Sequence, residues 1–157
     1  MSKNYCPGCY WEMREETAPG AGQECTKCGF RMPPKVKIIV WFSRHTILAA
    51  QEAGLREIFG EEVRIIIDVA PFDNAQNVVE RYNNWGAQEM VIVAPLSVIQ
   101  RLCEKGIRPI RPVMDCMGSF PSGGFIRETD VLEKGRHYRF RGFERIREIR
   151  IVTEPLP

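Results

Sequence analysis

Four short apolar segments alternate with three amphipathic segments between residues 36 and 113, and this alternation constrains the fold more than any other feature. The apolar segments are VKIIVWF (36–42), VRIIID (63–68), EMVIVA (89–94) and RPIRPV (108–113). Strands that are joined through helices make right-handed crossovers and therefore run parallel. The sequence predicts an α/β fold with a four-stranded parallel sheet of order 2-1-3-4. Pro109 and Pro112 confine the last strand to an edge, because proline lacks the N–H donor.

Each amphipathic segment carries a signal for the start of a helix. Thr46 is the predicted N-cap of the first helix, and Asp73 caps the second in a capping-box arrangement with Gln76. Pro95 lies where the first turn of the third helix tolerates proline. The predicted stops are the glycines that follow the apolar stripes, Gly60, Gly86 and Gly106. The helices are expected to cover both faces of the sheet.

Four cysteines near the N-terminus have the spacing of a zinc site. They form two Cys-x2-Cys pairs separated by fifteen residues: Cys6, Cys9, Cys25 and Cys28. A two-residue gap lets a tight turn aim both sulfurs at one ion, and Gly8 and Gly29 are predicted to supply the backbone freedom. The segment resembles a zinc ribbon over about residues 4 to 32. Because four thiolates close the coordination sphere of zinc, the predicted zinc is structural.

Composition shifts divide the chain into three parts. A linker at 33–35, which contains two prolines, separates the ribbon (1–32) from the predicted α/β domain (36–115). Residues 116–157 form a predicted C-terminal extension. The spacing of the cysteines leaves open whether the ribbon binds nucleic acid, binds a protein partner or braces the neighbouring domain.

The first strand ends in consecutive polar residues at a place where α/β sheets bind ligands. In the predicted order the chain reverses direction between strands 1 and 3, and the crevice outside their carboxyl ends is the usual ligand site. Arg44 offers a planar fork of donors for phosphate, and His45 can hold or release a proton near neutral pH. Helix N-termini on both sides would add positive dipole ends. The candidate ligand-binding residues are Ser43, Arg44, His45, Thr46, Pro95, Leu96 and Ser97.

These residues predict a phosphate or nucleotide pocket, with Arg44 and His45 as candidate catalytic residues. Gly-x-Gly-x-x-Gly and Walker motifs are lacking, which argues against a dinucleotide cofactor and against triphosphate hydrolysis. In the alternative interpretation, Arg44 pairs with a carboxylate such as Asp68 or Asp73 and His45 merely caps a turn. Asp68 and Asp115 are further candidates at the carboxyl edge.

Three stretches carry a family resemblance: FSRHT after the first strand, the helix AAQEAGLREIFG, and VIVAPLSVIQRLCEKGIRPIRPVM. They resemble small Rossmann-like proteins found near CRISPR systems, some of which are ring nucleases that cut cyclic oligoadenylates. The resemblance covers about residues 36–115. The N-terminal ribbon and the C-terminal extension depart from the usual single-domain form, and related proteins can bind such ligands without cutting them.

The resemblance implies a homodimer that binds a cyclic or linear RNA-like ligand across two crevices. Cleavage would need no metal, because a 2′-hydroxyl of the ligand attacks the adjacent phosphate. Arg44 and helix N-termini would stabilise the developing charge, and His45 would move a proton.

The C-terminal region contains RHYRFRGFERIREIR (136–150), which interleaves arginines with aromatic residues. Such a mixture can stack on bases while it meets phosphates. The simpler interpretation is a β-hairpin in which Tyr138 and Phe140 pack inward opposite Ile149 and Ile151, with the arginines in solvent.

Composition narrows the functional classes. The chain has 157 residues with 44% hydrophobic and 27% charged residues, and its net charge of +2 is too small to indicate nucleic-acid binding by itself. The N-terminus lacks the apolar core of a signal peptide, and apolar runs long enough to span a membrane are lacking, so a cytoplasmic location without membrane contact is expected. Two hypotheses follow: a nucleotide-binding enzyme or sensor, and a non-enzymatic adaptor whose ribbon or arginine-rich hairpin binds nucleic acid or protein.

Overall fold

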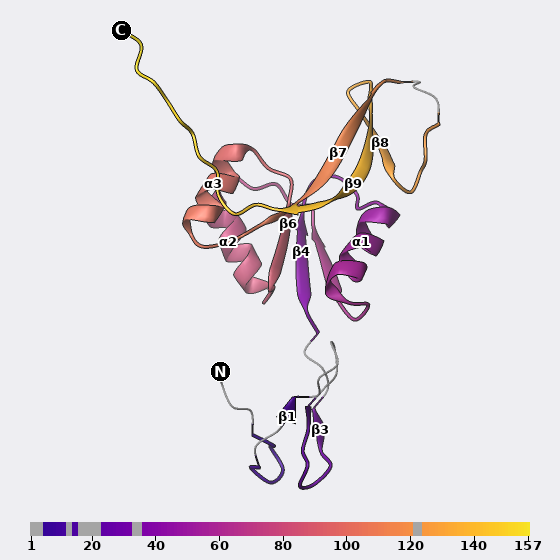
Figure 1. The fold of residues 1–157 in the computed structure, drawn as a ribbon, viewed down its shortest axis with the longest axis vertical. Coiled ribbons are helices and arrows are strands. Elements are labelled where there is room, and N and C mark those ends of the chain that lie inside the picture. The colour runs from indigo at the N-terminus through magenta and orange to yellow at the C-terminus, as the bar shows by residue number, and fades with distance from the viewer. Residues whose placement is uncertain (1–4, 12–13, 16–22, 33–35, 121–123) are drawn as a thin grey trace.

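The computed structural model describes residues 5–11, 14–15, 23–32, 36–120 and 124–157 (Figure 1). It contains an N-terminal antiparallel sheet of three short strands, β1 (Arg14–Glu15), β2 (Gln23–Glu24) and β3 (Arg31–Met32), in the order β1-β2-β3. The linker predicted at 33–35 lies outside the described residues.

The remaining elements build one mixed sheet with three helices. They are β4 (Ile38–Phe42), α1 (Ala49–Phe59), β5 (Arg64–Asp68), α2 (Ala75–Asn84), β6 (Glu89–Ile92), α3 (Leu96–Glu104), β7 (Ile110–Ser119), β8 (Asp130–Glu133) and β9 (Arg136–Arg145). The sheet has six strands in the order β5-β4-β6-β7-β9-β8. The first four in this order run parallel, in the predicted 2-1-3-4 arrangement. β9 runs antiparallel to both β7 and β8.

The prediction of a four-stranded, purely parallel sheet with β7 at its edge is therefore wrong. β9 pairs with β7 along its whole length, from Ile110 opposite Arg145 to Ser119 opposite Arg136. The prolines are tolerated because the parallel pairing of β7 with β6 is short: it is registered at Val91 opposite Ile110. Pro112 lies beyond that position. The backbone N–H that proline lacks is therefore not needed for the hydrogen bonds between β7 and β6.

The two faces of the sheet carry separate apolar clusters. β4 alternates its side chains, with Val40 and Phe42 facing α2 and α3, and Ile39 and Trp41 facing α1. All four are nearly or fully buried. Figure 1 accordingly shows α1 on one side of the sheet and α2 with α3 on the other.

The first helix begins later than predicted. Its N-cap is Leu48 instead of Thr46, and the backbone N–H of Leu48 donates to Gln51 Oε1 at 2.9 Å. In the segment before the helix, the Ser43 hydroxyl accepts a hydrogen bond of 3.1 Å from the backbone N–H of His45. This contact forms a turn directly after β4, so Ser43 and His45 lie in a loop before the helix.

The other helix starts lie close to their predicted positions. Asn74 caps α2 in place of Asp73, and its Oδ1 accepts from the backbone N–H of Asn77 at 2.9 Å. α3 begins at Leu96, with Pro95 directly before it as the N-cap. Pro95 therefore lies one position earlier than the predicted first turn.

The C-terminal aromatics pack against α1 and join the hairpin to the sheet. Phe140 and Phe143 contact each other with ring centroids 5.0 Å apart, and Phe143 meets Trp41 edge-on at 6.4 Å. Gly54 permits this approach, because a Cβ there would lie 3.2 Å from Phe143 Cε2. A hairpin is therefore present in this region, but its two strands are β8 and β9. The expected pairing with Ile149 and Ile151 is wrong, because β9 ends at Arg145.

Candidate functional site

The carboxyl ends of β4, β5 and β6 surround a pocket of about 540 Å³. Its lining residues follow these three strands, except for one from β8: Ser43, Arg44, His45, Val69, Ala70, Pro71, Phe72, Val93, Ala94, Pro95 and Glu133. Two loops that are far apart along the chain, around Arg44 and around Pro95, therefore share one pocket. The strand order explains this, because β4 lies between β5 and β6 and all three run parallel.

The two basic side chains of this pocket flank a carboxylate. Arg44 Nη2 lies 3.6 Å and His45 Nε2 lies 3.8 Å from Glu133 Oε1. The three side chains are 77%, 48% and 40% exposed, respectively. Ion pairs between such exposed groups contribute little free energy, so an anionic ligand can replace Glu133 as the partner of Arg44.

The remaining predicted ligand-binding residues have different surroundings. Ser43 is 4% exposed and uses its hydroxyl in the turn to His45. Thr46 lines a smaller neighbouring cavity. Leu96 and Ser97 are exposed at the start of α3 and lie outside the residues that line the larger pocket. Because α1 begins only at Ala49, the expected N-terminus of that helix does not follow Arg44 directly.

The smaller cavity has a volume of about 280 Å³ and adjoins the larger pocket. Both are lined by Ser43, His45, Val93 and Glu133. The smaller cavity is further lined by residues of β4, β7, β8, β9 and the α1 region: Trp41, Thr46, Gln51, Pro112, Met114, Val131, Leu132 and Tyr138. Apart from His45 and Glu133, which it shares with the larger pocket, its walls are mainly apolar.

Glu133 is the charged site residue that the sequence analysis missed, and the residues that follow β5, Val69 to Phe72, were missed as well. Glu133 ends β8, directly before the Lys134-Gly135 turn, where Lys134 and Gly135 both have positive φ. The turn residues could have suggested a hairpin at this position. Their sequence could not have indicated that β9 joins β7 and so brings Glu133 to the crevice.

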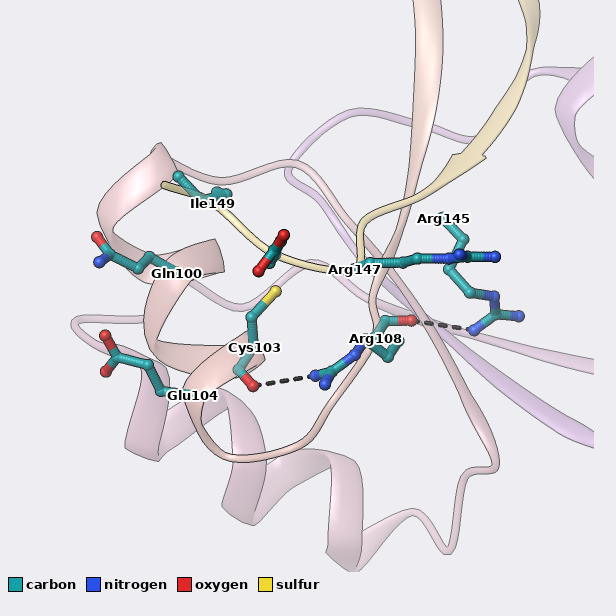
Figure 2. Close-up of a pocket in the computed structure, with 8 residues that line it drawn as sticks. Gln100, Cys103, Glu104, Arg108, Arg145, Arg147 and Ile149 are labelled. Carbon is teal, nitrogen blue, oxygen red and sulfur yellow. Dashed lines mark hydrogen bonds between the residues drawn. The ribbon is translucent and has the colours of Figure 1, made fainter. Parts of the chain in front are cut away.

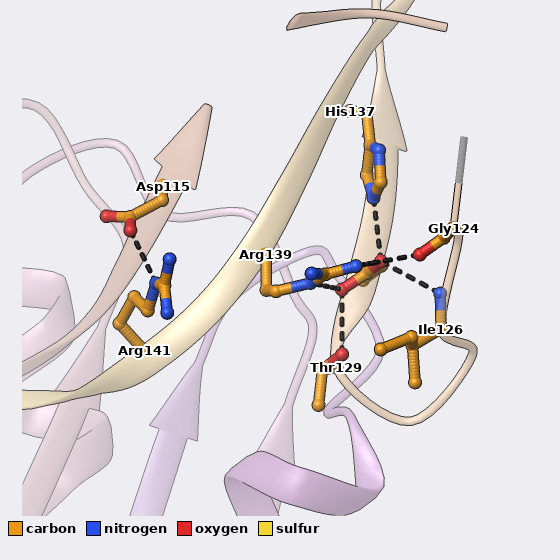
Figure 3. Close-up of polar contacts among 8 residues, drawn as sticks. Asp115, Gly124, Ile126, Thr129, His137, Arg139 and Arg141 are labelled. Carbon is orange, nitrogen blue, oxygen red and sulfur yellow. Dashed lines mark hydrogen bonds and ion pairs between the residues drawn. The ribbon is translucent and has the colours of Figure 1, made fainter. Parts of the chain in front are cut away.

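A buried polar network holds the start of β8, three residues before Glu133 (Figure 3). The Asp130 carboxylate is fully buried and accepts hydrogen bonds from Arg139 Nε and Nη2, each at 2.8 Å. It also accepts from Thr129 Oγ1 at 2.7 Å and from the backbone N–H of Ile126 at 2.8 Å, and His137 Nε2 lies 2.7 Å away.

Arg139 is the main reason that the pKa of Asp130 lies far below its ordinary value, although burial opposes the shift. Because Asp130 stays ionised, it can bind β9 and the preceding loop simultaneously. Arg139 extends the network by donating to the backbone carbonyl of Gly124 at 2.8 Å. The network thereby positions the strand that carries Glu133.

Asp68 and Asp115 have structural partners. Burial raises the pKa of Asp68, but hydrogen bonds from Arg81 and Trp85 outweigh burial and lower that pKa. Arg81 Nε donates to Asp68 Oδ2 at 3.0 Å, which ties α2 to β5. Asp115 pairs with Arg141 across β7 and β9 (Figure 3). The sequence suggested Asp68 or Asp73 as the partner of Arg44, whereas the structure pairs Arg44 with Glu133.

A third pocket, of about 670 Å³, lies between α3 and residues 145–149 (Figure 2). Two of its three arginines are engaged in structural contacts: Arg108 Nη1 donates to the Cys103 carbonyl at 3.0 Å, and Arg145 Nη1 lies 2.8 Å from Glu89 Oε2. Glu104 and Glu148 also line it, so the charge is mixed. Burial raises the pKa of the Cys103 thiol, which favours the unreactive protonated form.

The four N-terminal cysteines form a cluster that could hold a metal ion. Their sulfur atoms all lie within 4.8 Å of one another, and three pairs are 3.5 to 3.6 Å apart. The spacing-based prediction that these side chains gather around one point is confirmed.

Two turns with the same hydrogen bonds present the cysteines. The Cys6 N–H donates to the Trp11 carbonyl, and the Cys6 carbonyl accepts from the Tyr10 N–H. Cys25 repeats this pattern with the Phe30 carbonyl and the Gly29 N–H. Gly29 has φ +73° and Tyr10 has φ 55° at equivalent positions. The predicted role of Gly8 therefore belongs to Tyr10.

The thiols influence one another's ionisation. Burial raises the pKa of Cys25, but hydrogen bonds from the backbone of Cys28 and Lys27 outweigh burial and lower that pKa to about 7. A backbone hydrogen bond from Phe30 lowers the pKa of Cys28, but the surrounding thiols outweigh it and raise that pKa to about 12. A bound cation would favour the deprotonated form of all four thiols.

No family model, curated protein or solved structure matches the chain. The resemblance to ring nucleases stays a prediction, and the function is argued from the geometry. Among the described residues, every helix is too short or too polar to cross a membrane.

Proposed function

We propose that the pocket at the carboxyl ends of β4, β5 and β6 binds the phosphate groups of a nucleotide or an RNA-like ligand. The observation that carries this proposal is the meeting of the Arg44 and Pro95 loops in one pocket of about 540 Å³. Arg44 is exposed and its pair with Glu133 is long, so its donors are available for a phosphate. His45 supplies a second donor beside it.

The arrangement also supports metal-independent cleavage of such a ligand. The 2′-oxygen of the ligand would form a bond to the adjacent phosphorus while the bond from phosphorus to the 5′-oxygen breaks. The Glu133 carboxylate would accept the proton of the 2′-hydroxyl, and protonated His45 would give a proton to the departing 5′-oxygen. The products are a 2′,3′-cyclic phosphate and a 5′-hydroxyl. Arg44 would stabilise the negative charge on the phosphate.

Binding is tested with labelled cyclic tetra-adenylate and hexa-adenylate. Arg44→Ala is expected to weaken binding about tenfold or more, the range for a lost hydrogen bond to a charged group. Arg101→Ala is the matched control, because Arg101 is 73% exposed and its ion pair with Glu104 lies on α3, outside the pocket. Equal affinity of both variants and the unaltered protein would contradict the proposal.

Glu133→Gln separates binding from cleavage. The substitution removes a negative charge next to the ligand phosphate and frees Arg44, so ligand affinity is expected to rise about threefold. If the pocket also cleaves, turnover falls in Glu133→Gln and His45→Ala although the ligand remains bound. Chromatography of the products measures turnover, and a 2′,3′-cyclic phosphate end identifies the mechanism. The ring-nuclease hypothesis further predicts a homodimer, which light scattering measures.

The metal of the N-terminal cluster is proposed to be zinc with a structural role. A tetrahedral site with Zn–S bonds of about 2.3 Å has sulfur atoms about 3.8 Å apart. The distances of 3.5 to 3.6 Å in three pairs are close to this value. Cys6, Cys9, Cys25 and Cys28 would together supply the four ligands and leave no position for a reacting water.

Exposed aromatic residues near the cluster favour a second candidate function, binding of nucleic acid by the ribbon. Tyr10 is 81% and Trp11 is 52% exposed, and Lys27 Nζ lies 5.0 Å from the centre of the Trp11 ring. Aromatic faces beside a cation suit single-stranded bases. Retention of labelled single-stranded RNA that falls steeply with salt, is lost in Trp11→Ala and is unaffected by Arg44→Ala would support this adaptor function.

A further inference from the structure

One side chain that lines the smaller cavity, Trp41, carries an unsatisfied donor. Trp41 lies in β4, is 2% exposed and lines this cavity. Its indole nitrogen Nε1 is buried and has no hydrogen-bond partner among the described residues. Buried polar atoms are nearly always paired, and an unpaired one is costly. The side chain that carries this orphaned N–H lines the cavity, so a ligand bound there is the nearest source of a missing acceptor.

A second donor in this cavity is only weakly satisfied. Gln51 is 5% exposed, and its Oε1 is already engaged by the backbone N–H of Leu48. Its amide nitrogen Nε2 contacts Met114 Sδ at 3.8 Å, and a thioether is a weak acceptor. Two side chains that line the cavity, Trp41 and Gln51, thus carry N–H groups without a strong acceptor.

The shape and walls of the cavity narrow the chemistry of its ligand. A volume of about 280 Å³ is just below the range for small-molecule pockets, about 300 to 1,000 Å³, so it suits one compact group. Tyr138, Pro112 and Val131 contribute apolar surface to the lining. An uncharged, flat ring with acceptor atoms fits both the apolar walls and the free donors.

The neighbouring pocket indicates what this ring is attached to. Ser43, His45, Val93 and Glu133 line both spaces, so a ligand can occupy both at once. We propose that the smaller cavity binds the nucleobase of a nucleotide whose phosphate lies against Arg44, and that Trp41 Nε1 donates to an acceptor of the base. This inference rests on the proposed phosphate site. It also gives the C-terminal hairpin a function, because β8 and β9 supply one wall.

The base contribution is measured by comparing ribose 5-phosphate with the four nucleoside 5′-monophosphates AMP, GMP, CMP and UMP. Ribose 5-phosphate carries the phosphate without a base. At least one nucleotide is expected to bind about tenfold more tightly than ribose 5-phosphate, as one or two added hydrogen bonds predict. The indole proton of Trp41 provides a direct readout by NMR. Its signal, assigned through its loss in Trp41→Phe, is expected to shift with that nucleotide and to stay in place with ribose 5-phosphate.

Two variants and one control test the role of the cavity. Trp41→Phe keeps an aromatic ring but removes the N–H, and is expected to reduce the preference for nucleotide over ribose 5-phosphate about fivefold. Val131→Phe fills the cavity and is expected to abolish that preference. Both leave the affinity for ribose 5-phosphate unchanged. Val152→Phe is the matched control, because Val152 is 93% exposed in the C-terminal segment.

The outcomes separate this inference from the proposed function. Equal affinity for the nucleotides and for ribose 5-phosphate, with both dependent on Arg44, overturns the nucleobase site and leaves the phosphate site intact. Binding of none of these probes overturns both. Removal of an unpaired donor is expected to leave the melting temperature of Trp41→Phe unchanged or raised. If Trp41→Phe does not fold, Val131→Phe and the comparison of nucleotides with ribose 5-phosphate in the unaltered protein still test the nucleobase site.

Discussion

Serine in place of Cys25 is expected to abolish zinc binding and to unfold the N-terminal sheet, while the six-stranded sheet keeps its melting temperature. In the described part of residues 5–32, the buried residues are Cys6 and Cys25, so this region lacks an apolar core of its own. For small structural sites the binding free energy of zinc, about 10 to 16 kcal/mol in peptides at neutral pH, is the free energy of folding. Elemental analysis gives the zinc content, and NMR spectra report the fold of each sheet.

Cys116→Ser is the matched control for this experiment. Cys116 is exposed in β7 and stands apart from the cluster, so its replacement is expected to leave one zinc per chain. Treatment with a strong chelator is expected to reproduce the effect of Cys25→Ser. A folded N-terminal sheet in the metal-free protein would contradict the proposed structural role.

Asparagine in place of Asp130 is expected to lower the free energy of unfolding of the six-stranded sheet by about 3 kcal/mol. The substitution leaves Arg139 and His137 in a buried network without the negative charge that both contact. Asp115→Asn is the matched control, because its pair with Arg141 is about half exposed on both sides. Exposed pairs contribute at most about 1 kcal/mol. Urea denaturation at neutral pH measures both effects, and equal losses in the two variants would contradict the role assigned to Asp130.

The same residue predicts a dependence of stability on pH. The pKa of Asp130 is lower in the folded protein than in the unfolded chain, where an ordinary value of about 3.9 applies. Its contribution is therefore fully present above about pH 4 and decreases as the pH falls below that value toward the folded pKa. The unaltered protein is expected to lose stability more steeply below pH 4 than Asp130→Asn does. Because both proteins carry the same cysteines, protonation of the N-terminal cluster affects them equally. Parallel curves would contradict this prediction.

The features that could be predicted from the sequence depend on short-range patterns. The alternation of apolar segments and amphipathic helices predicted the order and parallel direction of β5, β4, β6 and β7. The Cys-x2-Cys spacing predicted that four sulfur atoms gather around one point. The parallel order also placed Arg44 and Pro95 at the same edge of the sheet. Each of these conclusions needs only the local period of a segment and the handedness of crossovers.

The features that only the tertiary structure decided depend on contacts between distant segments. β9 joins β7 because Phe140 and Phe143 pack over α1, where Gly54 permits their approach. Because of that pairing, β7 is an inner strand instead of the expected edge strand. The same pairing places Glu133 next to Arg44 and His45. It also encloses the cavity beside Trp41. A local pattern indicates which side chains share a face of a strand. The partner and register of that strand depend on which surfaces, from distant segments, can be buried together.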